Sequence, residues 1–200
     1  RYEILFRIKE GVQMRIGIDC DGVLRDFIPD LIHGIKTTHP QHADKILVPT
    51  SWDWEQWLPF WTEAETEKYV FEDNYLDYFG PFANPIKESH EDWTMIRRWA
   101  EDNGHKLILV SAQRPHCEDP TTEWLQRWGF MFDEIHYTKH KWSIDVDVLI
   151  DDSPEKLEQF ADRSVNHGKA ICFKQTWNTE CHTKYMSIDR LSDITTKLFG

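Results

Sequence analysis

The stretch Met14-Arg15-Ile16-Gly17-Ile18-Asp19-Cys20-Asp21-Gly22 decides the fold of this chain. Residues 14–19 are mostly short and apolar and include β-branched side chains, which is typical of a strand buried on both faces. Two carboxylates and a glycine follow at once, so the strand ends in a tight turn that carries Asp19 and Asp21. Alone, such a turn is either an ordinary solvated turn or part of a catalytic site, and residues farther along the chain decide between the two.

The rest of the chain alternates between helix-like and strand-like segments. Helical patterns cover residues 27–38, 88–103, 121–128, 154–160 and those from 188 onward. Strand patterns cover residues 106–110, 134–137, 146–150 and 169–173. Because strands separated by helices normally pair in parallel, the alternation predicts an α/β fold: a Rossmann-like parallel sheet flanked by helices.

Composition limits the classes of function. The chain of 200 residues is long enough for one ordinary domain with a small insertion. Its net charge of −12 argues against an extended nucleic-acid partner, because such a partner requires a basic surface. The four cysteines show no CxxC spacing, and the apolar runs are too short to cross a bilayer. We therefore expect a reduced, cytoplasmic protein with free thiols and no membrane partner.

The first thirteen residues stand apart from the pattern that begins at Met14. Residues 9–11 could be encoded by a purine-rich stretch that resembles a ribosome-binding site at a suitable distance from Met14. We therefore expect residues 1–13 to be a non-native N-terminal extension and Met14 to be the natural start. The alternative is an ordinary N-terminal strand, because residues 2–8 are strand-like too.

Three further polar features lie beside other predicted strands. Ser111 ends one strand, Asp151-Asp152 ends another, and Lys141 lies just ahead of the second. In parallel sheets, ligands bind at the carboxyl ends of the strands. A hydroxyl can hold a phosphate oxygen, a lysine can neutralise phosphate charge, and carboxylates are the hard ligands that suit Mg²⁺. Together with Asp19, these residues predict a site for phosphate chemistry.

In chain order, these residues resemble the four motifs of the haloacid-dehalogenase-like phosphatases. The motifs are Asp-Cys-Asp-Gly-Val-Leu at 19–24, Ser111, Lys141 and Asp151-Asp152. Two longer stretches are similar to the 5′(3′)-deoxyribonucleotidase branch. Residues 18–27 look like its opening motif, and residues 137–141 followed by 148–154 look like its closing pair. The resemblance covers the chain from Met14 to about Phe160.

The resemblance implies a Mg²⁺-dependent phosphomonoesterase that acts on nucleoside monophosphates through an aspartyl-phosphate. Asp19 would be the nucleophile, and Asp21 would protonate the leaving oxygen and then activate the water. Ser111 and Lys141 complete the implied catalytic set. Members of this branch are often dimers, so a homodimer is compatible with the resemblance.

The resemblance also implies the ligands of the Mg²⁺ ion. The Asp19 side chain, the Asp21 backbone carbonyl and Asp151 would hold the metal. Asp152 would either bind the metal through water or orient the loop, and the sequence leaves both open.

In this superfamily, an insert after the first motif forms a helical cap over the active site. Residues 30–84 occupy that position here, which would leave residues 14–29 and 85–200 as the phosphatase core. The insert is dense in aromatic residues. These side chains either build the core of a small cap or stack on a nucleobase.

The segment Thr50-Ser51-Trp52-Asp53-Trp54 resembles a segment in the caps of the nucleotidase branch. We therefore favour Trp52 or Trp54, over the other aromatic residues, as the side chain that stacks on the base. The predicted substrate-binding set also includes three residues close to the catalytic motifs: Gly22, Phe27 and Ala112.

Arg25 departs from the small residue expected at its position in the branch. It would either select a more highly charged substrate or point to solvent. Two other functions remain open at this point. One is a phosphatase for polynucleotide 3′-ends or another small phosphoester, and the other is a non-catalytic nucleotide-binding regulatory module.

Overall fold

The computed structural model describes residues 13–198 and contains the predicted parallel sheet. Six strands lie in the order β3-β2-β1-β4-β5-β6, and every neighbouring pair is parallel. Their bounds are β1 (Arg15–Ile18), β2 (Lys106–Ser111), β3 (Glu134–Tyr137), β4 (Val148–Asp151), β5 (Lys169–Phe173) and β6 (Met186–Ile188). The predicted α/β fold class is therefore confirmed.

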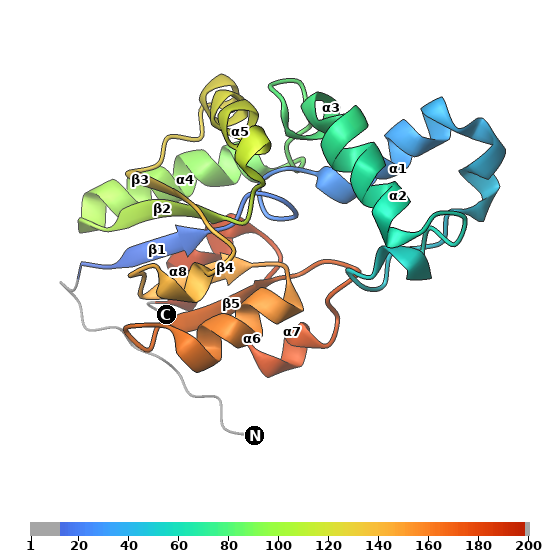
Figure 1. The fold of residues 1–200 in the computed structure, drawn as a ribbon. Coiled ribbons are helices and arrows are strands. Elements are labelled where there is room, and N and C mark those ends of the chain that lie inside the picture. The colour runs from blue at the N-terminus through green and yellow to red at the C-terminus, as the bar shows by residue number, and fades with distance from the viewer. Residues whose placement is uncertain (1–12, 199–200) are drawn as a thin grey trace.

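Helices cover both faces of the sheet (Figure 1). On one face, alternate strand residues such as Ile18, Leu109 and Ile150 pack with α4 (Ser89–Asn103), α5 (Pro115–Trp128) and α8 (Ile194–Lys197). On the other face, residues such as Val110 and Leu149 pack against Phe160 of α6 (Pro154–Arg163). Because successive side chains of a strand point to opposite faces, strands covered on both sides must be apolar throughout.

Two predicted elements were wrong. Ile188 does not begin a terminal helix; it ends β6, and only the short helix α8 follows. Helix α5 begins at Pro115, six residues before the predicted start at Thr121, and contains Pro120. A proline inside a helix removes one backbone hydrogen bond, which is why the sequence pattern favours a later start. Tertiary packing of the buried Cys117, before Pro120, holds the first turns in place.

A second apolar cluster lies beyond the carboxyl ends of the strands. Its residues come from α1 (Phe27–Thr38), a π-helical turn (Tyr69–Asp73), α3 (Tyr75–Phe79) and the segment before α2 (Glu63–Lys68), which supplies Trp57 and Leu58. Figure 1 shows these helices grouped beside the sheet. Cys117 of α5 and Trp177, near α7 (Cys181–Lys184), also belong to this cluster. The cluster includes Phe27 and Ile28, and the boundary of a cap at residue 30 stays a prediction.

All four cysteines are free, as expected, and all four are also buried. No helix among residues 13–198 is long and apolar enough to span a bilayer. The predicted N-terminal extension lies outside the described residues, except for Gln13.

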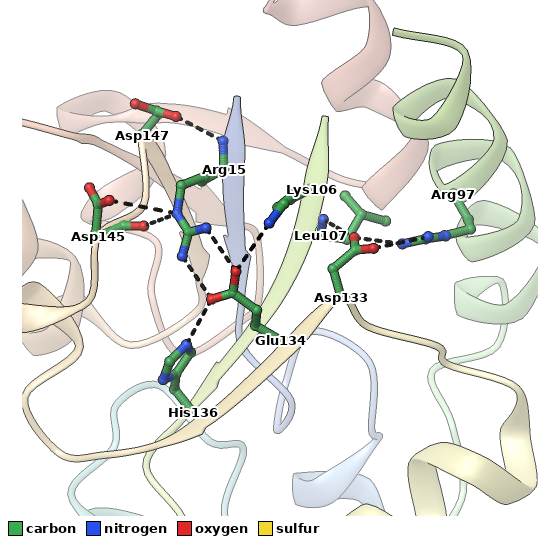
Figure 2. Close-up of polar contacts among 9 residues, drawn as sticks. All are labelled: Arg15, Arg97, Lys106, Leu107, Asp133, Glu134, His136, Asp145 and Asp147. Atoms are coloured by element: carbon green, nitrogen blue, oxygen red, sulfur yellow. Dashed lines mark hydrogen bonds and ion pairs between the residues drawn. The ribbon is translucent and has the colours of Figure 1, made fainter. Parts of the chain in front are cut away.

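The amino ends of three neighbouring strands are joined by an ion-pair network (Figure 2). Arg15 of β1 donates from Nη1 and Nη2 to the two carboxylate oxygens of Glu134 in β3, each at 2.8 Å. The Nζ of Lys106, at the start of β2, lies 3.6 Å from the same carboxylate, and His136 Nε2 lies 3.3 Å from it. The network thus links the starts of three strands at the end of the sheet opposite Asp19.

Replacing Glu134 with Gln should destabilise the protein by about 1 kcal/mol at pH 7, the upper range for an exposed ion pair. The hydrogen bonds from Arg15 and His136 lower the pKa of Glu134 to about 2. Its stabilising effect is therefore complete above the ordinary pKa near 4.5 and is lost as the pH falls towards 2. Urea unfolding of Glu134→Gln and of the wild type between pH 7 and pH 3 should show the difference shrinking with acid. A constant difference, or an equal loss in Glu123→Gln on the exposed side of α5, would contradict this role.

Candidate active site

The site lies where the direction of the strand order reverses. The chain passes from β1 to β2 on one side, while β4 pairs with the other side of β1. Ile18 is level with Ile150, and the Asp19 N–H donates to the Ile150 carbonyl at 2.9 Å. Asp19 and Asp151 therefore sit at adjacent carboxyl ends, in the crevice where such sheets bind ligands.

Three carboxylates and one ammonium group meet in this crevice. The carboxylate oxygens of Asp19, Asp151 and Asp152 lie within 4.8 Å of one another. Lys141 Nζ donates to Asp151 Oδ2 at 2.6 Å and lies 2.8 Å from Asp19 Oδ1, close enough for an ion pair but not aligned as a hydrogen bond. Asp151 and Asp152 are fully buried, and Asp19 and Lys141 are nearly so. One positive charge thus faces three acidic groups away from water.

Burial and the excess of acidic groups shift the pKa values of Asp19, Asp152 and Lys141. Burial raises the pKa of Asp19, and the charges of Asp151 and Asp21 raise it further, while Lys141 opposes the shift. Burial followed by the charges of Asp151 and Asp19 also raises the pKa of Asp152. Burial lowers the pKa of Lys141, but Asp151 and Asp19 more than offset this and hold it above its ordinary value. The cluster therefore favours either added protons or an added cation.

The residues present fit a divalent cation. Asp152 Oδ1 is buried and has no hydrogen-bond partner among residues 13–198. An unpaired buried carboxylate oxygen is costly unless a cation or proton compensates it. Clustered carboxylate oxygens are ligands for hard ions such as Mg²⁺. Asp19, Asp151 and Asp152 would hold such an ion, and the identity of the metal stays a prediction.

Asp21 is placed in the turn after Asp19 but outside this cluster of side chains. Arg25 Nε donates to Asp21 Oδ1 at 2.7 Å, and Gln113 Nε2 donates to Asp21 Oδ2. The Asp21 side chain is 19% exposed. A metal contact through its backbone carbonyl, as predicted, remains untested by these contacts.

Ser111 and Ala112 lie at the carboxyl end of a strand, as predicted. Ser111 is the last residue of β2, the neighbour of β1, and is buried. Ala112 comes directly after it and is partly buried. Both residues therefore lie at the same end of the sheet as Asp19, beside the carboxyl end of β1. Their roles in binding the substrate phosphate stay predictions.

Gly22 is required by the geometry of the turn. It has a φ of +74°, a region that side chains disfavour. A methyl group on it would overlap the Asp152 carboxylate, whose Cγ would be only 2.6 Å away. Gly22 therefore lets the turn after β1 pack directly against Asp152, which follows β4.

Sequence reasoning missed the residues that hold Asp152. Trp177 Nε1 donates to Asp152 Oδ2 at 2.8 Å, and Asn178 Nδ2 donates to the Asp152 carbonyl at 2.7 Å. Both residues follow β5, so a search of every strand's carboxyl end would have found them. Trp177 and Asn178 therefore fix the orientation of Asp152, one through its side chain and the other through its backbone.

The three aromatic residues of the predicted substrate-binding set have different surroundings. Phe27 is buried and stacks on Phe79 with ring centroids 5.5 Å apart. Trp54 stacks on Trp57 at 6.0 Å and also contacts Phe27 edge-on. These two rings help to form the second apolar cluster.

Trp52 differs from the other two because it contacts Trp177, which holds Asp152. Its ring lies edge-on to Trp177, with centroids 5.9 Å apart. Since Trp177 donates to Asp152, Trp52 is one residue removed from the buried acidic cluster. Contact of any of these rings with a base stays a prediction.

The solvent-facing alternative for Arg25 is wrong. Arg25 is fully buried, and its guanidinium contacts Asp21, the Phe79 carbonyl and Thr121. Sequence analysis did not anticipate this pairing, although the i, i+4 spacing of Asp21 and Arg25 was available as a signal.

The fold is that of the haloacid-dehalogenase-like hydrolases. Solved structures of similar shape include L-2-haloacid dehalogenase from Xanthobacter autotrophicus, with a TM-score of 0.60, 10% identity and coverage of 94% of this chain and 99% of that one. A haloacid dehalogenase-like family hydrolase from Streptococcus pneumoniae has a TM-score of 0.59 and 12% identity, covering 92% and 97%. At such low identity, these similarities establish the fold alone.

The chain belongs to the family of the 5′ nucleotidase, deoxy (pyrimidine), cytosolic type C proteins, whose profile matches residues 13–195. A Chlorobaculum tepidum protein named "Putative 5'(3')-deoxyribonucleotidase" is 23% identical over 172 residues, covering 82% of this chain and 80% of the relative. The protein is therefore a phosphoric monoester hydrolase of the 5′-nucleotidase type, which confirms the class predicted from the sequence.

Addition of Mg²⁺ should raise the melting temperature of the wild type by several degrees, because a ligand that binds only the folded state stabilises it. Asp152→Asn keeps an oxygen for Trp177 but removes one buried charge. In EDTA, this variant should melt a few degrees above the wild type, since repulsion in the cluster falls. It should also lose most of the Mg²⁺ effect.

Differential scanning fluorimetry with EDTA, Mg²⁺ and matched ionic strength checks both outcomes. Asp119→Asn, an exposed change on α5, is the control and should keep the wild-type shift. Equal Mg²⁺ shifts in the wild type and Asp152→Asn would show that Asp152 does not contribute to a metal site.

Proposed function

We propose that this protein is a Mg²⁺-dependent phosphatase that forms an aspartyl-phosphate on Asp19 and hydrolyses nucleoside monophosphates, as a 5′(3′)-deoxyribonucleotidase. The observation that carries the proposal is the pairing of the buried Asp19 with Lys141 inside the acidic cluster. Lys141 opposes the rise in the pKa of Asp19 that burial causes, so it favours the anion, which is the form that can attack phosphorus.

In the first step, an Asp19 carboxylate oxygen attacks the phosphorus atom, and the bond to the nucleoside oxygen breaks. Asp21 donates a proton to that leaving oxygen. In the second step, Asp21 accepts a proton from water, which attacks the phosphorus and releases Asp19 and inorganic phosphate. Lys141 and the Ser111 hydroxyl hold phosphate oxygens and offset their negative charge. A bound Mg²⁺ would supply further positive charge against the repulsion between phosphate and carboxylate.

Support for a nucleotide substrate comes from the family and from the named relative. The net charge of −12 favours a small substrate over a polynucleotide 3′-end. The family is named for cytosolic proteins, and the four cysteines are free. Both observations support a cytoplasmic location. The homodimer suggested by the family resemblance stays part of the proposal.

The first test is phosphate release from ribo- and deoxyribonucleoside monophosphates and from an aryl phosphate. We expect turnover that requires Mg²⁺, stops in EDTA and falls by at least about a thousandfold in Asp19→Asn, because the nucleophile is gone. Turnover of the aryl phosphate alone would contradict the proposal that the substrate is a nucleotide, and it would favour another small phosphoester as the substrate. No turnover of any substrate would favour a non-catalytic nucleotide-binding module.

Trp52→Ala should raise KM for nucleotides by about tenfold and leave KM for the aryl phosphate within about threefold, because loss of base stacking costs about 1–3 kcal/mol. Steady-state kinetics on both substrates checks this. Trp54→Leu is the matched comparison, since Trp54 packs between Phe27 and Trp57 and should mainly lower the melting temperature. An equal rise in both KM values for Trp52→Ala would argue against stacking.

A further inference from the structure

We propose that Arg25 is a positioning residue that fixes the orientation of the Asp21 carboxylate. Through Arg25, this carboxylate is also linked to α3 and to the segment between α3 and Pro85. This inference rests on the proposed role of Asp21 as the proton donor to the leaving group. Nothing in the family motifs requires an arginine here, because a small residue was expected at this position.

The first argument is that the guanidinium of Arg25 has a single defined location. Its side chain is 0% exposed. Nη1 donates to the Phe79 carbonyl at 3.1 Å, and Nη2 donates to Thr121 Oγ1 at 3.3 Å. The central carbon lies 5.0 Å from the Phe79 ring centroid and 5.1 Å from that of Trp124. Polar contacts and two aromatic rings therefore hold the planar group from several sides.

The second argument is that the third nitrogen of this fixed group, Nε, donates to Asp21. Nε contacts Asp21 Oδ1 at 2.7 Å, while Gln113 contacts the other oxygen. Each carboxylate oxygen thus has its own partner, and rotation of the Asp21 side chain would break at least one contact. A proton donor must be held within hydrogen-bond reach of the leaving oxygen, so control of this rotation bears directly on the first step.

The third argument is the position of Arg25 at the junction between the two apolar clusters. The chain leaves the core at Asp26, whose N–H donates to the Asn84 carbonyl at 2.9 Å, and Arg25 forms a backbone bridge with Pro85. Phe79 ends α3 just before this returning segment. Because the Phe79 carbonyl holds the guanidinium, displacement of α3 would displace Arg25 and with it Asp21.

Lysine cannot replace arginine in this arrangement. An ammonium group carries the same charge but lacks the planar fork that reaches Asp21, Phe79 and Thr121 together. Arg25→Lys therefore tests positioning while keeping the charge. Gln113→Ala releases the other oxygen of Asp21 and leaves Arg25 unchanged, so it tests the same idea without altering the buried arginine.

The test compares kcat/KM for a deoxynucleoside monophosphate and for p-nitrophenyl phosphate. For each substrate, kcat/KM reports on the steps up to release of the leaving group, so it does not include the later hydrolysis of the phosphoenzyme. A sugar alkoxide needs a proton to leave, whereas p-nitrophenolate leaves as a stable anion. For Arg25→Lys, we expect kcat/KM to fall by about 10- to 100-fold on the nucleotide and by less than about threefold on the aryl ester. Gln113→Ala should show the same selectivity with a smaller loss.

Controls separate the failure of this inference from the failure of the proposed function. Asp21→Asn should show the largest loss that depends on the leaving group, and its absence would overturn the role of Asp21 itself. If Asp21→Asn is selective while Arg25→Lys and Gln113→Ala lower both substrates equally or neither, positioning by Arg25 is wrong. Arg190→Lys alters another arginine paired with a buried aspartate, Asp92, and should leave both values unchanged. If Arg25→Lys does not fold, the selectivity of Gln113→Ala decides the matter.

Discussion

The ammonium group of Lys141 lies between Asp19 and Asp151, and the structure of the site depends on these two contacts. Burying an unpaired carboxylate is costly, and here three acidic groups are buried together. Lys141 compensates for part of this charge and leaves a deficit that a divalent cation can fill. The parallel pairing of β1 with β4 brings Asp19 and Asp151 together, so the sheet and the charge cluster must form together.

Two series of contacts connect the acidic cluster and the turn that carries Asp21 to the second apolar cluster. One passes from Trp52 to Trp177 and on to Asp152. The other passes from Phe79 to Arg25 and on to Asp21. The first reaches a candidate metal ligand, and the second reaches the candidate proton donor. Trp52 and Phe79 both belong to the second apolar cluster, so displacement of that cluster would act on both the candidate metal ligand and the candidate proton donor.

Most of the fold could be predicted because strand and helix patterns are local. The strands at 134–137 and 169–173 and the helix at 27–38 occur with the expected bounds. Strand β6 could not be found in this way, because three residues carry too little periodicity and their state depends on pairing with β5. The predicted start of α5 was wrong for a related reason, because tertiary packing outweighs the local effect of Pro120.

By itself, the sequence determined the α/β class, the residues that end β1, β2 and β4, and the excess of acidic groups over Lys141. These follow from hydrophobic periodicity and from the rule that parallel strands present their carboxyl ends at one edge. Only the tertiary structure decided the partners of those residues: the burial of Arg25 against Asp21, the hold of Trp177 on Asp152, and the need for Gly22 beside that carboxylate. These contacts join residues from different elements, and side-chain direction and burial are set only when the sheet, α5 and the loop after β5 pack together.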